Sequence, residues 1–235
     1  MRRGGLTKTQ KNGQKPQDST QQIQSRMVIA QKPKVKIQSL PKLNSGSSSD
    51  NFYTPPGPLI ALLNVIQIPK DYTIWEPACG SGYICNFFSE NGYVCAGSDL
   101  SGKYGFKFDF LKETWEELGW DCIVTNPPFS LKDQFLAKCY EYGKPFALLL
   151  PINAIGAGGR QKLYRENGVE IIMLGRRIHC QPNNDPNVTK GSSPKQELCW
   201  ITNGFGIGQQ ITFYDLPKEL DGSKEFSRCP LDTEK

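Results

Sequence analysis

From residue 51 onward, short apolar runs alternate with amphipathic stretches along the chain. The apolar runs have the length of buried strands, and the amphipathic stretches have the pattern of helices that cover a sheet. Strands are predicted over 72–75, 93–98, 122–125, 145–150, 169–174 and 197–202. Helices are predicted over 58–65, 82–90, 112–118, 131–142 and 160–167. This alternation is typical of an α/β fold with a parallel sheet flanked by helices.

Charge divides the chain at about residue 50. The first 50 residues carry ten Lys and Arg against two Asp, a net charge of +8, whereas the other 185 carry 18 against 21 Asp and Glu, a net charge of −3. A basic, Gln- and Ser-rich segment buries too little apolar surface to offset its ordering entropy. We therefore predict a disordered basic tail over 1–50, a folded domain over 51–216 and a C-terminal tail over 217–235. The basic tail is either solvated or a non-specific phosphate-binding arm.

The composition of the chain predicts its cellular compartment and whether it binds a metal. The longest apolar run, 146–151, is far shorter than the roughly 18 residues of a membrane span. No apolar segment follows Arg2 and Arg3, so we expect no secretion signal and no membrane partner. The eight cysteines form no C-x-x-C pair and the chain has one histidine, so no metal site is predicted. Free cysteines in apolar runs indicate a reducing, cytoplasmic compartment.

A glycine-containing turn follows the strand predicted over 72–75 and opens the next helix. Gly80 and Gly82 allow the backbone to turn tightly and to approach a ligand closely. The helix N-terminus beyond them suits a carboxylate, and Glu76 at the strand end suits a cationic amine. Asp99 ends the following strand, where an acid commonly binds ribose hydroxyls. The turn is not a dinucleotide fingerprint, because Cys85 occupies the place of the third glycine.

The segment N-P-P-F at 126–129 follows the apolar run 122–125. Two consecutive prolines at a strand end remove two donors and give a rigid projecting turn. The Asn126 side chain and the proline carbonyls would then direct oxygen acceptors to one place, beside the flat face of Phe129. Such an arrangement is suited to bind a planar group that carries an NH₂.

Together these motifs resemble the class I S-adenosylmethionine-dependent amino-methyltransferases, in particular the N6-adenine DNA methyltransferases. Five segments match in order over residues 53–129: T-P-P after Tyr53, E-P-A-C-x-x-G from Glu76, the acid Asp99, F-D-F-L at 108–111 and N-P-P-F at 126–129. The general likeness extends to about residue 203. It implies a Rossmann-like, mostly parallel seven-stranded sheet whose last strand is reversed.

The resemblance implies S-adenosylmethionine as the cofactor and adenine in nucleic acid as the substrate, with DNA favoured over RNA. The implied cofactor-binding residues are Tyr53, Thr54, Pro55, Glu76, Ala78, Gly80, Gly82, Asp99, Asp109, Phe110 and Asn126. The implied catalytic residues are Asn126, Pro127, Pro128 and Phe129. We expect nucleic-acid contacts from Phe129, Arg176, Arg177 and Lys190.

Two departures from the family pattern affect substrate recognition. The stretch between Asp99 and Asp109 is too short for the usual helix and full strand, so that edge of the sheet should be trimmed. No separate target-recognition domain follows, which leaves loop 175–196, the basic arm and the last 30 residues as candidates for substrate contact. Short chains of this plan resemble small phage-type DNA adenine methyltransferases, which implies a bacterial or phage-infected cell.

Other substrates stay open at this point. RNA adenine methyltransferases also carry N-P-P-F, whereas cytosine N4 enzymes more often carry Ser-Pro-Pro and enzymes that modify protein glutamine prefer Tyr in place of Phe129. A non-catalytic nucleic-acid-binding module with a decayed methyltransferase fold is a further alternative. The motifs do not indicate the target sequence or the oligomeric state.

Overall fold

The computed structural model describes residue 1 and residues 52–114, 119–182 and 195–223. The chain divides into two units, Met1–Lys34 and Val35–Lys235, and every element below belongs to the second. The predicted basic tail lies outside the described residues. The helix predicted over 112–118 is not found in its described part, because residues 112–114 form a turn and coil.

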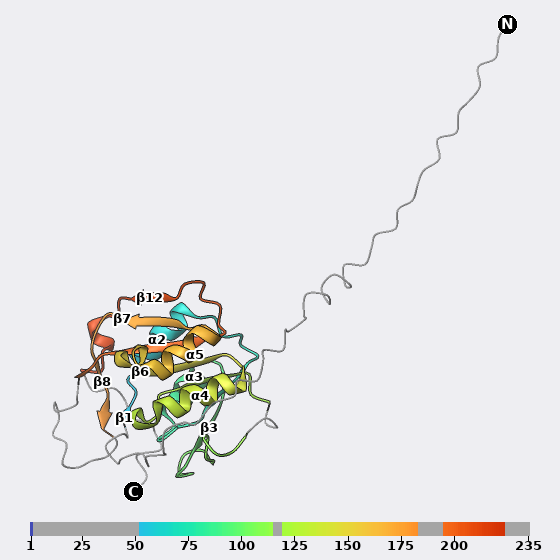
Figure 1. Ribbon diagram of the computed structural model, residues 1–235. Helices are drawn as coiled ribbons and strands as arrows, with labels where there is room; N and C mark the ends of the chain where they lie inside the picture. The colour runs from blue at the N-terminus through green and yellow to red at the C-terminus, as the bar shows by residue number, and fades with distance from the viewer. Residues whose placement is uncertain (2–51, 115–118, 183–194, 224–235) are drawn as a thin grey trace. The chain divides into compact units, whose positions relative to one another are not determined.

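One eight-stranded sheet organises the described residues, in the order β12-β7-β11-β6-β5-β2-β3-β4 (Figure 1). Its strands are β2 (Thr73–Glu76), β3 (Val94–Asp99), β4 (Phe106–Lys107), β5 (Cys122–Thr125), β6 (Phe146–Pro151), β7 (Glu170–Leu174), β11 (Leu198–Asn203) and β12 (Ile211–Tyr214). Only β11 runs against its neighbours, β6 and β7. The predicted mostly parallel sheet with a reversed strand is confirmed, and the two-residue β4 is the expected trimmed edge. The eighth strand, β12, was not predicted.

Four α-helices flank the sheet in the described part of the chain: α2 (Pro56–Val65), α3 (Tyr83–Glu90), α4 (Lys132–Tyr142) and α5 (Gly158–Asn167). Short 3₁₀ turns are η2 (Phe129–Leu131), η3 (Ile152–Ile155) and η4 (Lys218–Leu220). Pro56 and Pro58 suit the first turn of α2, where backbone N–H groups have no acceptor within the helix. No helix in the described residues is both long and apolar enough to cross a bilayer.

Successive residues of the buried strands point to opposite faces of the sheet and enter two separate cores. On β6, Ala147 and Leu149 belong to the core under α2 and α3, whereas Leu148 and Leu150 belong to the core under α4 and α5. The strands are buried on both faces and therefore read as continuous apolar runs. This three-layer arrangement is the reason that the apolar runs predicted the strands.

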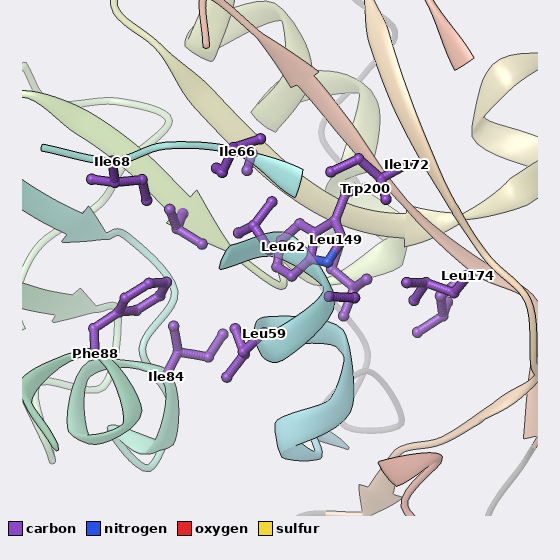
Figure 2. Close-up of a cluster of buried hydrophobic side chains, with 14 of the residues drawn as sticks. Leu59, Leu62, Ile66, Ile68, Ile84, Phe88, Leu149, Ile172, Leu174 and Trp200 are labelled. Carbon is purple, nitrogen blue, oxygen red and sulfur yellow. The ribbon is translucent and has the colours of Figure 1, made fainter. Parts of the chain in front are cut away.

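The core under α2 and α3 is centred on a buried tryptophan. Figure 2 shows Leu59 and Leu62 of α2 beside Trp200 and Leu149. The Trp200 indole N–H donates a hydrogen bond of 2.8 Å to the Pro58 carbonyl oxygen. Strand β11 is thereby tied to the first turn of α2.

Aromatic rings fill much of the core on the other face. The Trp75 ring lies 5.3 Å from that of Phe110 and 5.1 Å from that of Trp120, and the Phe110 ring stacks on Phe135 at 4.7 Å. The Trp75 indole N–H also donates to Ser98 Oγ at 2.9 Å, which joins β2 to β3.

Two short antiparallel pairs hold the ends of loop 175–196. Strand β1 (Phe52–Tyr53) pairs with β9 (Gln181–Pro182), and β8 (Ile178–His179) pairs with β10 (Lys195–Gln196). The predicted loop therefore carries strands at both ends, while 183–194 lies outside the described residues.

The domain continues past its predicted end at residue 216. Leu216 and Asp221 are buried, and the Asp221 carbonyl accepts a hydrogen bond from the His179 backbone N–H at 2.9 Å. The predicted tail at 217–235 is therefore wrong for residues 217–223, which pack on the domain. Residues 224–235 lie outside the described part.

At Gly57, helix α2 packs tightly against the C-terminal segment 217–223. A Cβ at Gly57 would lie 2.0 Å from the Leu220 carbonyl oxygen, so the backbone would have to shift. We predict that Gly57→Ala lowers the free energy of unfolding by about 1–3 kcal/mol, measured by urea denaturation. Gly159→Ala on α5 is the control, since a Cβ there meets nothing within 4 Å, and it should stabilise by up to about 1 kcal/mol. Equal effects of the two substitutions would contradict the close contact.

Candidate active site

The candidate site lies where three parallel strands end beside one another. Strand β2 pairs with β3 on one side and with β5 on the other, so the carboxyl ends of all three meet at one edge of the sheet. The chain passes from β2 to β3 and β4 in one direction and then crosses to β5 on the opposite side. In open α/β sheets such a switch in strand order creates the crevice where ligands bind.

A hollow with an empty volume of about 530 Å³, partly open to solvent, occupies this edge. The hollow is lined by Phe52, Tyr53, Thr54, Ala78, Cys79, Gly80, Ser81, Tyr83, Ile84, Asp99, Asn126 and Pro128. Its wall thus combines the turn after β2, the end of β3, the turn after β5 and strand β1.

The turn between β2 and α3 forms one wall of this pocket. Gly80 and Gly82 have φ angles of +50° and +78°, which side-chain-bearing residues rarely adopt. The Gly80 N–H donates to Asp99 Oδ2 at 3.2 Å, and the Ser101 N–H donates to Asp99 Oδ1 at 2.8 Å. A Cβ at Gly80 would meet no atom within 4 Å, so the turn exposes open backbone to the pocket.

Glu76 is fully buried at the end of β2, behind the pocket lining. Its Oε1 accepts hydrogen bonds from the Thr125 hydroxyl and from the Ala78 N–H, the latter at 3.1 Å. Its Oε2 is buried and has no partner among the described residues. Burial raises the pKa of the Glu76 carboxyl to about 8. In the free protein this group is therefore mostly neutral at pH 7, and it would have to release its proton to bind a cation at Oε2.

The turn after β5 presents a second buried acceptor. Asn126 Nδ2 donates to Thr54 Oγ1 at 2.9 Å, while Asn126 Oδ1 is buried without a partner in the described part of the chain. Pro128 lines the pocket beside it. Phe129 opens η2, and Lys132 Nζ donates to its carbonyl oxygen at 3.1 Å. A buried oxygen with no donor costs about 1–3 kcal/mol, which suits an atom that waits for a ligand.

Comparison with known proteins gives two relatives in sequence, while no protein-family model matches the chain. The type II methyltransferase M.EcoRI of Escherichia coli is 30% identical over 162 residues, which cover 60% of this chain and 47% of that protein. The type II methyltransferase M.TthHB8I of Thermus thermophilus is 31% identical over 105 residues, 40% of this chain and 24% of that protein. The chain thus spans about half the length of the first relative and about a quarter of the second.

The sheet has the strand arrangement that the sequence resemblance implied. It is mostly parallel, with β11 reversed between β6 and β7. The described domain has the class I methyltransferase fold. Among solved structures, the type IIG restriction endonuclease BpuSI matches with a TM-score of 0.46 and 14% identity, over 64% of this chain and 25% of that one.

The methyltransferase fold brings many of the predicted site residues into one pocket. Tyr53, Thr54, Ala78, Gly80, Asp99, Asn126 and Pro128 all line it. Pro55, Gly82, Pro127 and Phe129 adjoin lining residues in the chain but are not part of the lining. Glu76 also lies outside the lining and accepts a hydrogen bond from the N–H of Ala78, which lines it. The individual roles assigned to these residues stay predictions.

Asp109 and Phe110 are not part of the pocket lining. The Asp109 carboxylate accepts the Leu111 N–H at 3.1 Å and pairs with Lys112 at 2.8 Å. Phe110 is buried, with its ring against Phe135 and Trp75. Both residues hold the segment after β4 in place, and their predicted contact with the cofactor is not seen in the lining.

The predicted nucleic-acid contacts follow β7 in the methyltransferase fold. Arg176 Nε donates to the Leu216 carbonyl oxygen at 2.7 Å, and Arg177 pairs with Glu197 at 2.9 Å. Lys190 lies outside the described residues. The β1–β9 pair places the loop end at Gln181 opposite Tyr53, a pocket residue. The loop thus begins beside the pocket, as a substrate-contact loop would.

Five lining residues were not predicted: Phe52, Cys79, Ser81, Tyr83 and Ile84. Cys79 and Ser81 lie within the glycine turn, and Tyr83 and Ile84 open α3. Their place close to Gly80 and Gly82 in the chain was a usable signal, because a turn that contacts a ligand contacts it with consecutive residues. Phe52 carried no comparable signal.

The buried carboxyl of Glu76 makes folding stability depend on pH. Its pKa rises from 4.5 to about 8 on folding, so the folded state holds a proton that the unfolded state has released. The resulting stabilisation is complete below about pH 4.5 and is lost as pH rises to about 8, at about 1.4 kcal/mol per pH unit. We predict that wild-type protein loses stability relative to Glu76→Gln over this window, measured by urea denaturation.

The control for this measurement is Glu166→Gln, which removes a carboxylate at the surface of α5. Its stability should follow that of wild type at each pH. Parallel curves for wild type and Glu76→Gln would contradict a protonated Glu76.

Proposed function

We propose that this protein transfers a methyl group from S-adenosylmethionine to the exocyclic N6 amino group of adenine in DNA. The observation that carries the proposal is Asn126 Oδ1, a buried acceptor without a partner among the described residues. It belongs to a residue of the same pocket as Gly80 and Asp99, the residues expected to hold the cofactor. A substrate amine bound in this pocket would donate the hydrogen bond that Asn126 Oδ1 lacks.

The pocket residues fit the proposed cofactor. Glu76 Oε2 is an unpaired buried oxygen for the cationic amine, and the first turn of α3 offers backbone N–H groups to the carboxylate. Asp99 retains lone pairs for the ribose hydroxyls, since each of its oxygens accepts one backbone hydrogen bond. When bound, S-adenosylmethionine would supply an electrophilic methyl group on sulfur.

The protein's contribution to the reaction would be positioning. The N6 nitrogen of adenine is a poor nucleophile because its lone pair is delocalised into the ring. Asn126 Oδ1 and the Pro127 carbonyl oxygen would accept its two hydrogens, which favours a pyramidal nitrogen with a directed lone pair. Orientation and fixed dipoles are established sources of catalysis and need no general base. This suits a pocket whose lining contains no histidine.

Adenine in DNA is the target that the sequence resemblance favours. Both relatives are named type II methyltransferases. The T-P-P and E-P-A-C segments of this chain resemble the DNA enzymes of the family more than the RNA enzymes. In duplex DNA the target base would have to be flipped out of the stack, where Phe129 would give it a stacking surface. Arg176 and Arg177 are the proposed backbone contacts, in the loop whose Gln181 pairs with the pocket residue Tyr53.

The direct test is transfer of labelled methyl from S-adenosylmethionine to duplex DNA, single-stranded DNA and RNA in parallel, followed by nucleoside analysis. We expect N6-methyldeoxyadenosine from DNA. N6-methyladenosine from RNA alone would transfer the proposal to RNA, and N4-methyldeoxycytidine would replace adenine with cytosine. Binding of the cofactor without any nucleic-acid product would contradict the proposal and favour a protein substrate.

Asn126 provides the test of the chemistry. We predict that Asn126→Ala abolishes methyl transfer but leaves the Kd for S-adenosylmethionine within a few-fold of wild type, because the lost oxygen faces the substrate amine. Calorimetry gives the Kd and labelled transfer gives the rate. Asn203→Ala removes a side-chain amide on β11, outside the pocket, and should leave both values unchanged. Equal loss of binding and of transfer in Asn126→Ala would contradict the assigned role.

A further inference from the structure

Thr54 and Asn126 are 72 residues apart in the chain and meet inside the pocket. Thr54 is 3% exposed, and its Oγ1 accepts a hydrogen bond from Asn126 Nδ2 at 2.9 Å. The contact joins the end of β1 to the turn after β5. It is the point at which the wall built by β1 touches the proposed catalytic amide.

This contact holds one end of the amide and leaves the other end without a partner among the described residues. An asparagine side chain carries a donor and an acceptor of nearly the same shape, so a rotation of 180° exchanges them. With Nδ2 held by Thr54, the acceptor Oδ1 is the end left without a protein partner in the described residues. The rotated amide would turn its own N–H groups toward the hydrogens of a substrate amine, and that arrangement is repulsive.

We propose that Thr54 is a positioning residue that locks the Asn126 amide in place, so that its unpartnered oxygen can accept a hydrogen bond from the substrate. The locked amide accepts a hydrogen bond and therefore suits a ring that carries an NH₂. A ring carbonyl in the same place would put its oxygen opposite Asn126 Oδ1. Neither acceptor would then receive a hydrogen bond, at a cost of about 1–3 kcal/mol. The inference rests on the proposed function and adds the residue that positions its hydrogen-bond acceptor.

Thr54 is itself held in place from both sides along the chain. Before it, Tyr53 pairs with Gln181 in the β1–β9 ladder. After it come Pro55, with φ of −67°, and Pro56 in the first turn of α2. A Cβ at Gly222 would lie 2.9 Å from Pro55, so the backbone of the 217–223 segment packs directly against this turn. A β-branched side chain on such a backbone has few χ1 rotamers, which fixes the position of its hydroxyl oxygen.

The family resemblance assigns Thr54 to the cofactor, and the two roles give different outcomes on substitution. A residue that binds the cofactor changes the Kd for S-adenosylmethionine. A residue that acts through Asn126 changes kcat at saturating cofactor and leaves that Kd in place.

The experiment compares Thr54→Val, which replaces the hydroxyl with a methyl of similar size, with Thr54→Ser, which keeps the hydroxyl. The substrate is unmethylated duplex DNA at saturating S-adenosylmethionine, and calorimetry gives the cofactor Kd. We expect kcat to fall about 10–100-fold in Thr54→Val, as misplacement of a positioning group does, with the Kd within about twofold. Thr54→Ser should recover most of the activity.

The matched control is Thr202→Val, which removes a buried hydroxyl that donates to the Glu170 carbonyl oxygen on β7, outside the pocket. It should leave kcat and Kd unchanged. Wild-type kcat in Thr54→Val, or a raised Kd with unchanged kcat, would overturn the positioning role alone. Wild-type protein that methylates none of the nucleic acids would overturn the proposed function and the inference built on it.

A second readout does not depend on activity. The side-chain NH₂ of Asn126 gives its own NMR signals, and a hydrogen bonded to Thr54 should exchange slowly with solvent. Slow exchange in wild type and Thr54→Ser, with fast exchange in Thr54→Val, supports the locked amide. Fast exchange in the wild-type protein would overturn it, whatever the methyl-transfer assay gives.

Discussion

Parallel pairing of β2 with β3 and with β5 is the constraint on which the pocket depends. The register Glu76↔Gly97 on one side and Trp75↔Ile123 on the other brings the three carboxyl ends together. Glu76, Asp99 and Asn126 are distant in the chain, and only this pairing makes them neighbours. Because side chains alternate between the faces, a slip of one residue in β2 would exchange Trp75 with Ile74 or Glu76. The site therefore depends on the register of β2 as well as on the identity of its residues.

The two cores are what hold that register. Ile74 packs into the core under α2 and α3, and Trp75 packs into the core under α4. These two environments differ in shape, since one surrounds Trp200 and the other is a cluster of aromatic rings around Trp75. Neither residue would fill the other's place well, because close-packed interiors tolerate changes of shape poorly. Packing on both faces thus fixes the edge at which the polar groups of the site meet.

The sequence predicted the central strands, four of the five helices and the strand-end motifs, because buried parallel strands are continuous apolar runs and the turns after them contain proline and glycine. It did not predict β12, an edge strand in which Ile211 and Phe213 are exposed and no apolar run forms. The sequence also did not predict where the Phe110 ring lies. Its motif suggests a ligand contact, whereas three-dimensional packing puts its ring between Trp75 and Phe135. The contact of Thr54 with Asn126 depends on tertiary structure alone.

The long sequence separation of that contact has a consequence for how the site arises during folding. The glycine turn after β2 and the acid at the end of β3 lie within 24 residues of each other and are joined by local pairing. Thr54, by contrast, precedes every strand of the main sheet, and Asn126 follows its middle strand β5. Closing such a separation costs more chain entropy than local pairing does. A nascent or partly unfolded chain would thus form the glycine turn before Thr54 meets Asn126, so that the complete pocket is present only in the fully folded molecule.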